Sequence, residues 1–415
     1  LERAHDPPEH FLEGPRAQAG LARRLVHDAR GGVHGQVGHL GAQAQLGVSA
    51  NDGGGGSPLS YTWSASGGNV VADGASATWS SSSPGTFTVG VTVVNQAGGQ
   101  ASASLPVTAT LALPQGSLAS PAAKPRQLAA GPRGELYLVD GYGQLWVLSA
   151  RGDVMARPTL PELASAVAVA GEEVLVATRQ GKLVRLDSRG GGTSSAPVSL
   201  NAAYGPGSVA WEATRGFLWL AEYMADQVRA VRLDGTTAIR LDAAGNTGLS
   251  RPVGVAIDAA AGVVYVLHHD AADSPVVSAF TVDGSWLRSF PASLAPNAAA
   301  GIAVGAEGRI FVTDRFYGRV RVLSPAGAAV DTLGSYGPDV GQLRLPEGVA
   351  LLGNGDILVA NVDVNRLERF GTGAAPATCL VGGQLDSDCD GLPDWWEKKY
   401  GLNPNWAGDA LLHLA

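Results

Sequence analysis

The chain has 415 residues with 57 Gly and 24 Pro, about one residue in five, which excludes a protein of long helices and favours short strands joined by many turns. Its net charge of −8 leaves no basic surplus for binding nucleic acid, and no apolar run approaches the ~20 residues of a membrane-spanning helix. Two cysteines are too few for a disulfide scaffold, so burial of apolar side chains must stabilise the two or three domains that this length predicts.

Residues 1–45 differ in composition from the rest of the chain. They are Arg-rich in places, show no sustained period of 2 or 3.6 residues, and contain five of the eight histidines. The histidine spacings match no zinc pattern, so we expect a disordered segment without a metal site. The opening residues also lack the charged and apolar regions of a secretory signal, so we expect that the chain is a fragment or that its true start lies elsewhere.

Residues 46–113 alternate between apolar and polar side chains, with turn clusters every 8–12 residues, which predicts an immunoglobulin-like β-sandwich. The stretches 59–63, 84–89 and 91–104 resemble the polycystic-kidney-disease (PKD) type of domain, a spacer common in secreted bacterial proteins. The first strand of that family is degraded or missing from the expected position.

Two tryptophans of this segment, Trp63 and Trp79, lie on the inward parity of their strands. We therefore expect both to be core residues. A platform for binding carbohydrate is the alternative.

Six internal repeats occupy residues 114–375. Each begins with a small apolar pair, 39 to 47 residues after the previous pair, and continues with a turn and two further apolar strands. The pairs are Leu128-Ala129, Val167-Ala168, Val209-Ala210, Val255-Ala256, Ile302-Ala303 and Val349-Ala350. One such unit is too small to bury both faces of its sheet, so six units are expected to stack around an axis as a six-bladed β-propeller.

The repeats resemble the NHL repeat, with its opening glycine and valine. The copy at residues 312–320, where Val-Thr-Asp is followed by Gly-Arg-Val, is the nearest to that motif, and the fourth repeat carries an insertion at 270–275. The resemblance implies a fold and says little about activity.

The last blade lacks a fourth strand in the sequence after Phe370. Residues 113–120 are expected to supply it from the N-terminal side, because such an exchanged strand ties both ends of the ring together and removes an exposed edge. The alternative is that residues 377–381 supply it.

The residue that directly follows each second strand forms an equivalent set, which strand repetition places at one end of the ring. The set consists of Asp140, Thr178, Glu222, His268, Asp314 and Asn361. One interpretation is a cation or polar-ligand site at the channel mouth, with His268 and His269 as candidates for catalysis or metal binding. The other, which we favour, is that these side chains accept hydrogen bonds from the next turn. No Ser-His-Asp or Cys-His arrangement can be assembled from the spacing, so we assign no catalytic residue.

The run from Asp386 to Glu397 has the spacing of a twelve-residue calcium loop. Asp386, Asp388, Asp390, Leu392 (through its carbonyl), Asp394 and Glu397 occupy the ligand positions, with Gly391 at the turn. Five carboxylates this close repel one another unless a hard cation lies between them, and oxygen ligands alone select calcium over zinc.

This loop departs from an EF-hand, because Pro393 takes position 8 and no helix pattern precedes it. Residues 394–404 resemble the thrombospondin type 3 or dockerin-like calcium repeats of secreted bacterial proteins. We therefore predict a calcium-binding module over residues 376–415, in which a second repeat is absent. A disulfide between Cys379 and Cys389 would close a small ring and order the start of the loop, and free thiols are the alternative.

Together these features predict an all-β, secreted or cell-surface protein that binds calcium. Its expected activity is adhesion or binding, in which the propeller presents loops to an extracellular protein or glycan. The alternatives are a propeller enzyme, a lactonase-like hydrolase or a lyase with its site at the channel mouth, and a structural subunit of a surface layer or filament.

Overall fold

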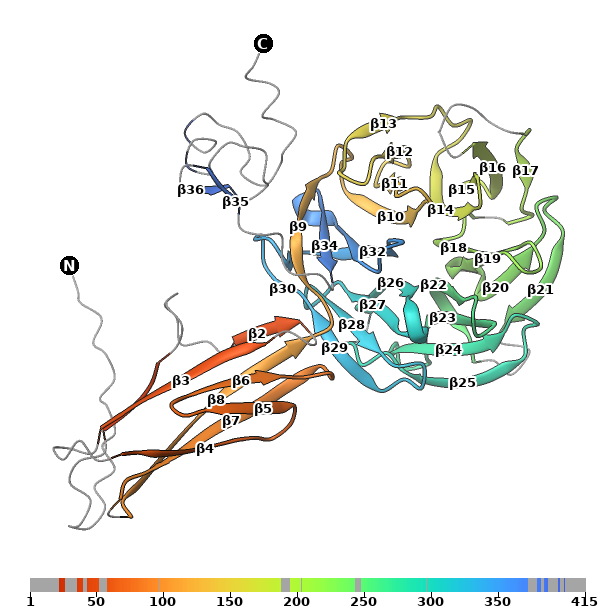
Figure 1. Cartoon of the computed structure of the whole chain (residues 1–415). Coiled ribbons are helices and arrows are strands. Elements are labelled where there is room, and N and C mark those ends of the chain that lie inside the picture. The colour runs from red at the N-terminus through yellow and green to blue at the C-terminus, as the bar shows by residue number, and fades with distance from the viewer. Residues whose placement is uncertain are drawn as a thin grey trace, which may run out of the picture. The chain divides into compact units, whose positions relative to one another are not determined.

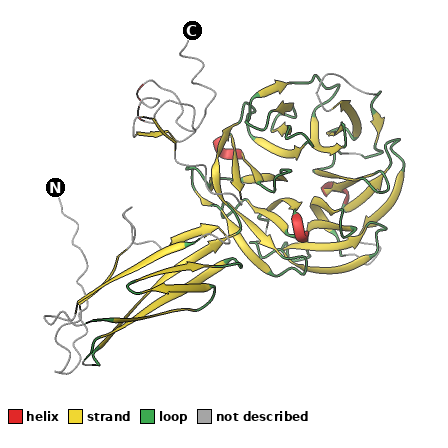
Figure 2. Ribbon diagram, in the orientation of Figure 1, coloured by secondary structure: helices red, strands yellow, loops and turns green. Residues whose placement is uncertain are grey.

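The computed structural model describes most of the chain in two compact units, residues 1–110 and 111–415. The described residues are 22–26, 36–39, 43–51, 58–96, 98–187, 195–202, 204–242, 248–295, 297–371, 379–381 and 384–386, with Trp395 and Lys399. Nearly all of their regular structure is strand, as Figure 2 shows, so the predicted all-β class is confirmed. No helix within these ranges is both long enough and apolar enough to cross a membrane.

The first unit is a sandwich of two four-stranded sheets, ordered β1-β3-β6-β5 and β2-β8-β7-β4. Its strands are β1 (Ala22–Val26), β2 (Gln36–His39), β3 (Ala44–Asn51), β4 (Ser60–Ala65), β5 (Asn69–Asp73), β6 (Ser76–Ser80), β7 (Gly85–Val94) and β8 (Gln100–Thr110). Leu46, Trp79, Val89 and Val107 form its buried core.

Strands β1 and β2 fall within residues 1–45, for which we expected disorder. β1 pairs antiparallel with β3, and β2 pairs parallel with β8. The expectation is wrong for these two strands, because a strand that adds to the edge of an existing sheet gains its hydrogen bonds from its neighbour. Such a strand needs little apolar alternation of its own. The other residues of 1–42 lie outside the described ranges.

The two tryptophans of the sandwich have core roles. Trp79 is 2% exposed, and its Nε1 donates to the carbonyl of Gly67 at 2.9 Å. Trp63 is half-buried against the same core and donates to the carbonyl of Gly74 at 3.0 Å. Both indole N–H groups are therefore used within the domain, as the core interpretation expected.

The second unit contains six four-stranded sheets arranged as the blades of a closed propeller (Figure 1). Blade 1 is β10 (Pro125–Ala130), β11 (Leu136–Asp140), β12 (Leu145–Leu148) and β13 (Val154–Ala156); blade 2 is β14 (Ala164–Ala170), β15 (Glu173–Thr178), β16 (Lys182–Asp187) and β17 (Val198–Ser199); blade 3 is β18 (Ser208–Glu212), β19 (Phe217–Glu222), β20 (Gln227–Val231) and β21 (Thr237–Asp242); blade 4 is β22 (Ser250–Asp258), β23 (Val263–His269), β24 (Pro275–Thr281) and β25 (Trp286–Pro291); blade 5 is β26 (Ala299–Val304), β27 (Ile310–Asp314), β28 (Arg319–Leu323) and β29 (Ala329–Leu333); blade 6 is β32 (Pro346–Leu351), β33 (Ile357–Asn361), β34 (Arg366–Gly371) and β9 (Leu113–Ala119).

Three short 3-10 helices, η1 (Tyr223–Ala225), η3 (Ala306–Gly308) and η4 (Val362–Val364), and two short strand pairs complete the described elements of the second unit. β30 (Ser335–Tyr336) pairs parallel with β31 (Gln342–Leu343) in the connection between blades 5 and 6. β35 (Cys379–Val381) pairs with β36 (Gln384–Asp386) after the last blade.

The apolar side chains of neighbouring blades pack against each other. Leu138 of blade 1 lies in one buried cluster with Leu358 of blade 6, and Val139 of blade 1 lies in another with Val176 of blade 2. Each blade thus buries on its neighbours the faces that it cannot bury alone, as the repeat length required.

Glycine allows the innermost strands to approach closely in part of the ring. A Cβ on Gly301 would lie 2.3 Å from the backbone oxygen of Glu347 in the next blade, and one on Gly348 would lie 2.4 Å from that of Arg126. Both glycines directly precede the repeated apolar pair, so the glycine of the repeat is explained by the contact between blades.

The ring is closed by strand exchange, as predicted. β9 pairs antiparallel with β34, with Leu118 opposite Leu367, whereas residues 379–381 pair with β36 instead. The carboxylate of Glu368 on β34 is fully buried and joins the two ends of the ring: Ser117 Oγ donates to both of its oxygens at 2.9 Å. Gly341 N also donates to it at 3.0 Å, and Arg366 forms an ion pair with it.

We expect Glu368→Ala to destabilise the propeller by about 3–5 kcal/mol, because it leaves Ser117, Gly341 N and Arg366 without their shared acceptor. Urea denaturation measures the change. Glu307→Ala is the matched control, since the side chain of Glu307 is 72% exposed in a surface ion pair, and it should change stability by less than about 0.5 kcal/mol. Equal effects of the two substitutions would contradict the role of Glu368 in closing the ring.

Candidate functional site

Antiparallel pairing within every blade brings two kinds of loop to the same end of the ring. These are the loops between the second and third strands, and the loops that lead into each first strand. We call this end the mouth face. The six equivalent residues of the sequence prediction all lie here, at the end of the second strands β11, β15, β19, β23, β27 and β33.

All six predicted residues are buried, with exposed fractions between 0% and 4%. Asp140 accepts hydrogen bonds from Tyr142 N and Gln144 N, both at 2.9 Å, and Asp314 accepts from Phe316 N and Tyr317 N. These bonds are those of a side chain that fixes the turn after its own strand.

The remaining side chains of the set are also engaged within the fold. Thr178 Oγ1 donates to Glu162 at 2.8 Å, and Glu222 forms a buried, bidentate ion pair with Arg229. The amide of Asn361 accepts from Arg344 N and donates to the carbonyl of Gln342. The set therefore stabilises the loops of the mouth face.

His268 belongs to a directional chain of hydrogen bonds inside blade 4. Its Nδ1 faces the carbonyl of His269 at 3.0 Å, so Nδ1 carries the proton and Nε2 accepts from Ser278 Oγ at 2.7 Å. Ser289 then donates to Ser278 at 2.7 Å, and Trp286 Nε1 donates to Ser289 at 3.1 Å. The His268–Ser278 pair offers a substrate almost no accessible surface, because His268 is 3% exposed and Ser278 is fully buried.

Burial lowers the pKa of His268 below its ordinary value, although the carbonyl of His269 opposes the shift. The unfolded chain therefore takes up a proton as the pH falls through about 6.5, while the folded chain stays neutral. Stability from this site is fully present above that pH and is lost progressively below it.

His268→Gln should make the urea midpoint less dependent on pH between pH 7 and pH 5, because glutamine can still accept from Ser278 but does not titrate. The measurement is urea denaturation of both proteins across this range. Asp283→Asn, at a carboxylate that is 70% exposed, should keep the wild-type slope. An unchanged slope in His268→Gln would show that His268 does not titrate differently on folding.

A different set of residues lines the mouth of the channel. In blades 1, 2 and 6 the first strand carries a register shift near its start, which frees Arg126, Ser165 and Glu347 from the regular ladder. Each lies two positions before the repeated apolar pair. Bulges redirect side chains in this way, and the sequence prediction missed these residues because it followed the ends of the second strands.

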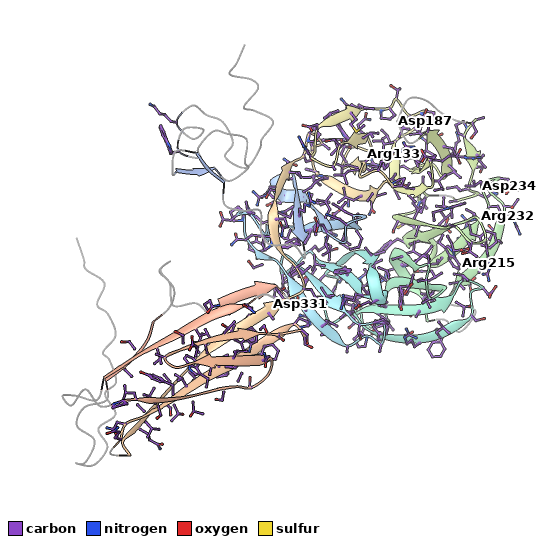
Figure 3. The ribbon with its side chains drawn as sticks, viewed as in Figure 1. Arg133, Asp187, Arg215, Arg232, Asp234 and Asp331 are labelled. Carbon is purple, nitrogen blue, oxygen red and sulfur yellow. The ribbon has the colours of Figure 1, made fainter. Side chains whose placement is uncertain are left out.

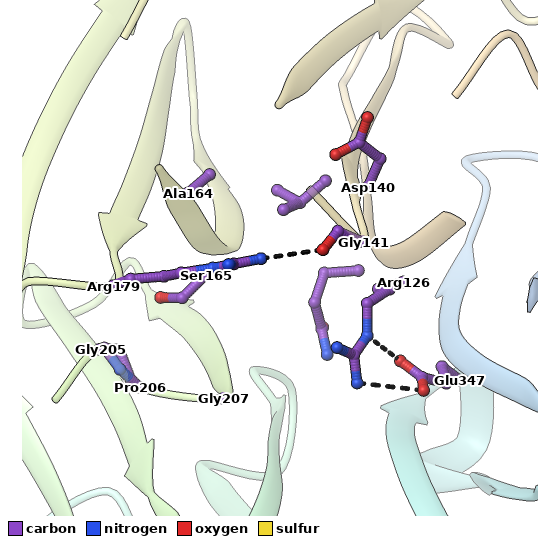
Figure 4. Close-up of a pocket in the computed structure, with 12 residues that line it drawn as sticks. Arg126, Asp140, Gly141, Ala164, Ser165, Arg179, Gly205, Pro206, Gly207 and Glu347 are labelled. Atoms are coloured by element: carbon purple, nitrogen blue, oxygen red, sulfur yellow. Dashed lines mark hydrogen bonds and ion pairs between the residues drawn. The ribbon is translucent and has the colours of Figure 1, made fainter. Parts of the chain in front are cut away.

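These side chains border a cavity of about 340 Å³ (Figure 4). It is lined by Arg126, Gln127, Val139, Asp140, Gly141, Ala164, Ser165, Arg179, Gly205, Pro206, Gly207 and Glu347. Four blades contribute to it, so the cavity lies at the mouth of the central channel.

Two guanidinium groups project into this cavity from opposite sides (Figure 4). Arg126 binds Glu347 through Nε at 2.5 Å and Nη2 at 3.1 Å. Arg179 donates from Nη2 to the carbonyl of Gly141 at 3.0 Å, and Arg315 forms a second ion pair with Glu347. The mouth therefore presents several guanidinium groups, each hydrogen-bonded or ion-paired to a neighbouring blade.

Six exposed aromatic side chains stand on the loops of the mouth face, and we call them the aromatic collar. They are Tyr142, Tyr204, Tyr223, Phe316, Tyr317 and Tyr336, with exposed fractions from 39% to 68%. Arginine accompanies two of them: Arg319 lies over the ring of Tyr317 at 4.8 Å and Arg344 over that of Tyr336 at 5.9 Å. Exposed apolar surface of this kind commonly marks a site of interaction.

Metal ligands are not gathered in the described part of the propeller. No group of three or more His, Cys, Asp or Glu side chains lies close together in those residues, and Glu347 is already held by two arginines. This donor set does not fit a divalent cation.

The predicted calcium ligands fall outside the described side chains. They are Asp386, Asp388, Asp390, Leu392, Asp394 and Glu397, and the same holds for the side chains of Cys379 and Cys389. The backbone of Asp386 is described, and it lies opposite Cys379 in the pair of β35 and β36.

Comparison with known proteins identifies the first unit. Residues 30–109 match the family model of the PKD domain. This segment is a PKD domain. The match begins before residue 46 and includes β2 and β3, whereas β1 precedes it.

The propeller is similar in fold to several solved structures. A streptogramin B lyase is 15% identical with a TM-score of 0.45, over 69% of this chain and 89% of the other. A gluconolactonase from Xanthomonas campestris is 16% identical with a TM-score of 0.47, over 61% and 88%. An inactive virginiamycin B lyase from Staphylococcus aureus with quinupristin is 13% identical with a TM-score of 0.46, over 75% and 99%. None of these similarities bears on activity, and no curated protein matches the chain.

Proposed function

We propose that this is an extracellular or cell-surface binding protein whose propeller presents the mouth face to an extracellular protein or glycan. The observation that carries the proposal is the aromatic collar, since six large aromatic side chains remain exposed around one end of an otherwise well-packed ring. The PKD domain supports the location, because domains of this type are common spacers in secreted proteins.

The composition of the mouth face suits recognition. Tyrosine and arginine are, with tryptophan, the residues enriched at the energetic centres of binding surfaces, because each offers a large contact area together with hydrogen-bond donors. An arginine stacks on each of Tyr317 and Tyr336, so these side chains are already partly ordered in the free protein. Binding a ligand therefore costs less conformational entropy.

The enzyme hypothesis lacks a matching constellation in the described residues. The His268–Ser278 pair is buried, and the two carboxylates that line the cavity, Asp140 and Glu347, are held by a turn and by arginines. A lactonase-like or lyase activity would need an accessible base or metal site. Binding therefore accounts better for the geometry.

We also propose that the C-terminal loop binds calcium and stiffens the segment after the propeller. Its support is the ligand spacing from Asp386 to Glu397, with a disulfide between Cys379 and Cys389 to order the loop start. Both features belong to the oxidising, calcium-rich space outside the cell.

The collar is tested by the double substitution Phe316→Ala with Tyr317→Ala. We expect it to reduce binding by about 10-fold or more, because truncating central aromatic residues commonly costs over 1.4 kcal/mol. The measurement is binding to an immobilised glycan array and to a displayed peptide library. Met155→Ala is the control, since Met155 is 56% exposed on the outer strand β13. Equal binding of both variants and the wild type would contradict the proposal.

Calcium binding is tested on the oxidised full-length chain by isothermal titration after treatment with a chelator. We expect one site in the wild type and no binding at that site in Asp390→Ala, which removes a predicted ligand. Asp283→Ala, at an exposed carboxylate of the propeller, should bind calcium as the wild type does. Absence of calcium binding in the wild type would reject the site.

A further inference from the structure

Two arginines and two carboxylates line the channel-mouth cavity. Arg126 and Arg179 line it, and Arg315 reaches its rim through Glu347, which is the single carboxylate shared by Arg126 and Arg315. Glu347 is thus paired with two arginines, one of them outside the lining of the cavity, and it forms no ion pair with Arg179.

Asp140 also borders the cavity but forms no ion pair with these arginines. Its oxygens accept from Tyr142 N, Gln144 N and, at 3.0 Å, Trp146 Nε1. Figure 4 shows its carboxylate turned away from both guanidinium groups. Both of its oxygens are thus hydrogen-bonded within blade 1.

Arg179 differs from the other two arginines, because it has no carboxylate partner among the described residues. Its side chain is exposed to the cavity, its one hydrogen bond runs to the carbonyl of Gly141, and it forms no ion pair with any residue that the structure describes. A guanidinium fork retains several N–H donors after one such bond, arranged to grip a planar oxyanion with two parallel hydrogen bonds.

The other walls of the cavity offer a hydrogen-bond acceptor and open space to the rest of a molecule that carries such an oxyanion. Ser165 donates its hydroxyl proton to the carbonyl of Ala177 at 3.2 Å, so its oxygen still accepts. Nothing lies within 4 Å of where a Cβ on Gly207 would stand, so the wall is open at that point. A cavity of this size holds a small organic molecule.

We propose that the channel mouth binds a small organic carboxylate, with Arg179 and Arg126 as the residues that hold its two oxygens. The inference rests on the proposed binding function and names a ligand class for the centre of the same face. Glu347 is the resident carboxylate that positions Arg126 and competes with the ligand for it.

Three ligands test which kind of anion the cavity binds. They are glucuronate as a sugar acid, succinate as a simple acid, and inorganic phosphate. Glucose is the neutral control for glucuronate. Binding to the full-length protein is measured by isothermal titration at low ionic strength. We expect saturable binding of at least one carboxylate, weaker binding of phosphate, no binding of glucose, and loss of affinity in 1 M salt.

Two substitutions at the site should act in opposite directions. Arg179→Gln should weaken carboxylate binding by about 10-fold or more, since it removes a charge-assisted pair of hydrogen bonds. Glu347→Gln should strengthen it several-fold, because it removes the competing negative charge. Thermal unfolding of both variants checks that the propeller remains folded.

Arg232→Gln is the matched control, because Arg232 lies at the outer rim of blade 3, in the turn at the other end of the ring (Figure 3). It should leave carboxylate binding unchanged. Absence of binding by both carboxylates, or binding that Arg179→Gln does not weaken, overturns the inference. Weaker binding in folded Glu347→Gln also overturns it, and tighter binding of phosphate rejects the carboxylate assignment. Any of these results leaves the collar experiment to decide the proposed function separately.

Discussion

The pairing of β9 with β34 is the interaction on which the propeller depends. It joins residues about 250 positions apart, so it forms only when all intervening blades are in place. Without it, β34 would present an unpaired edge, and the apolar faces of blades 1 and 6 would be exposed to water. The buried carboxylate of Glu368 adds directional bonds at this junction, because it accepts from Ser117 on the exchanged strand.

The same junction determines the chemistry of the channel mouth. Arg126 is on the first blade and Glu347 on the last, so their ion pair forms across the seam of the closed ring. Gly348 allows the two inner strands to approach there, since a Cβ would meet the backbone oxygen of Arg126. A fully formed ring is thus a precondition for the cavity, because the ion pair of Arg126 with Glu347 requires blades 1 and 6 to be in contact.

The sequence predicted the architecture through repetition. The apolar pairs located six blades, and the missing last strand after Phe370 pointed to exchange with residues 113–120, which β9 confirms. It did not predict β1 and β2, because strands at a sheet edge depend on hydrogen bonds from their neighbours more than on their own side-chain pattern.

The functional residues show a second limit of sequence analysis. Asp140 and Asp314 were placed correctly at the ends of their strands, yet their hydrogen bonds serve the turns. Arg126 and Glu347 face the channel only because a register shift interrupts the period of two in β10 and β32. The alternation of side chains in the sequence does not predict such a shift. The cavity therefore became visible only in three dimensions.

Where an inner strand carries a register shift, its residues fall into two groups with different roles. Residues within the ladder maintain the blade, whereas residues at the shift are released from it, and this occurs in five of the six blades. Arginine, serine and glutamate all occupy such positions without altering the flanking pairs. The ring thus offers a set of replaceable side chains on a constant frame, so a new binding specificity could be engineered at the shifted positions of blades 1, 2 and 6 while the strand pairing that closes the propeller is left intact.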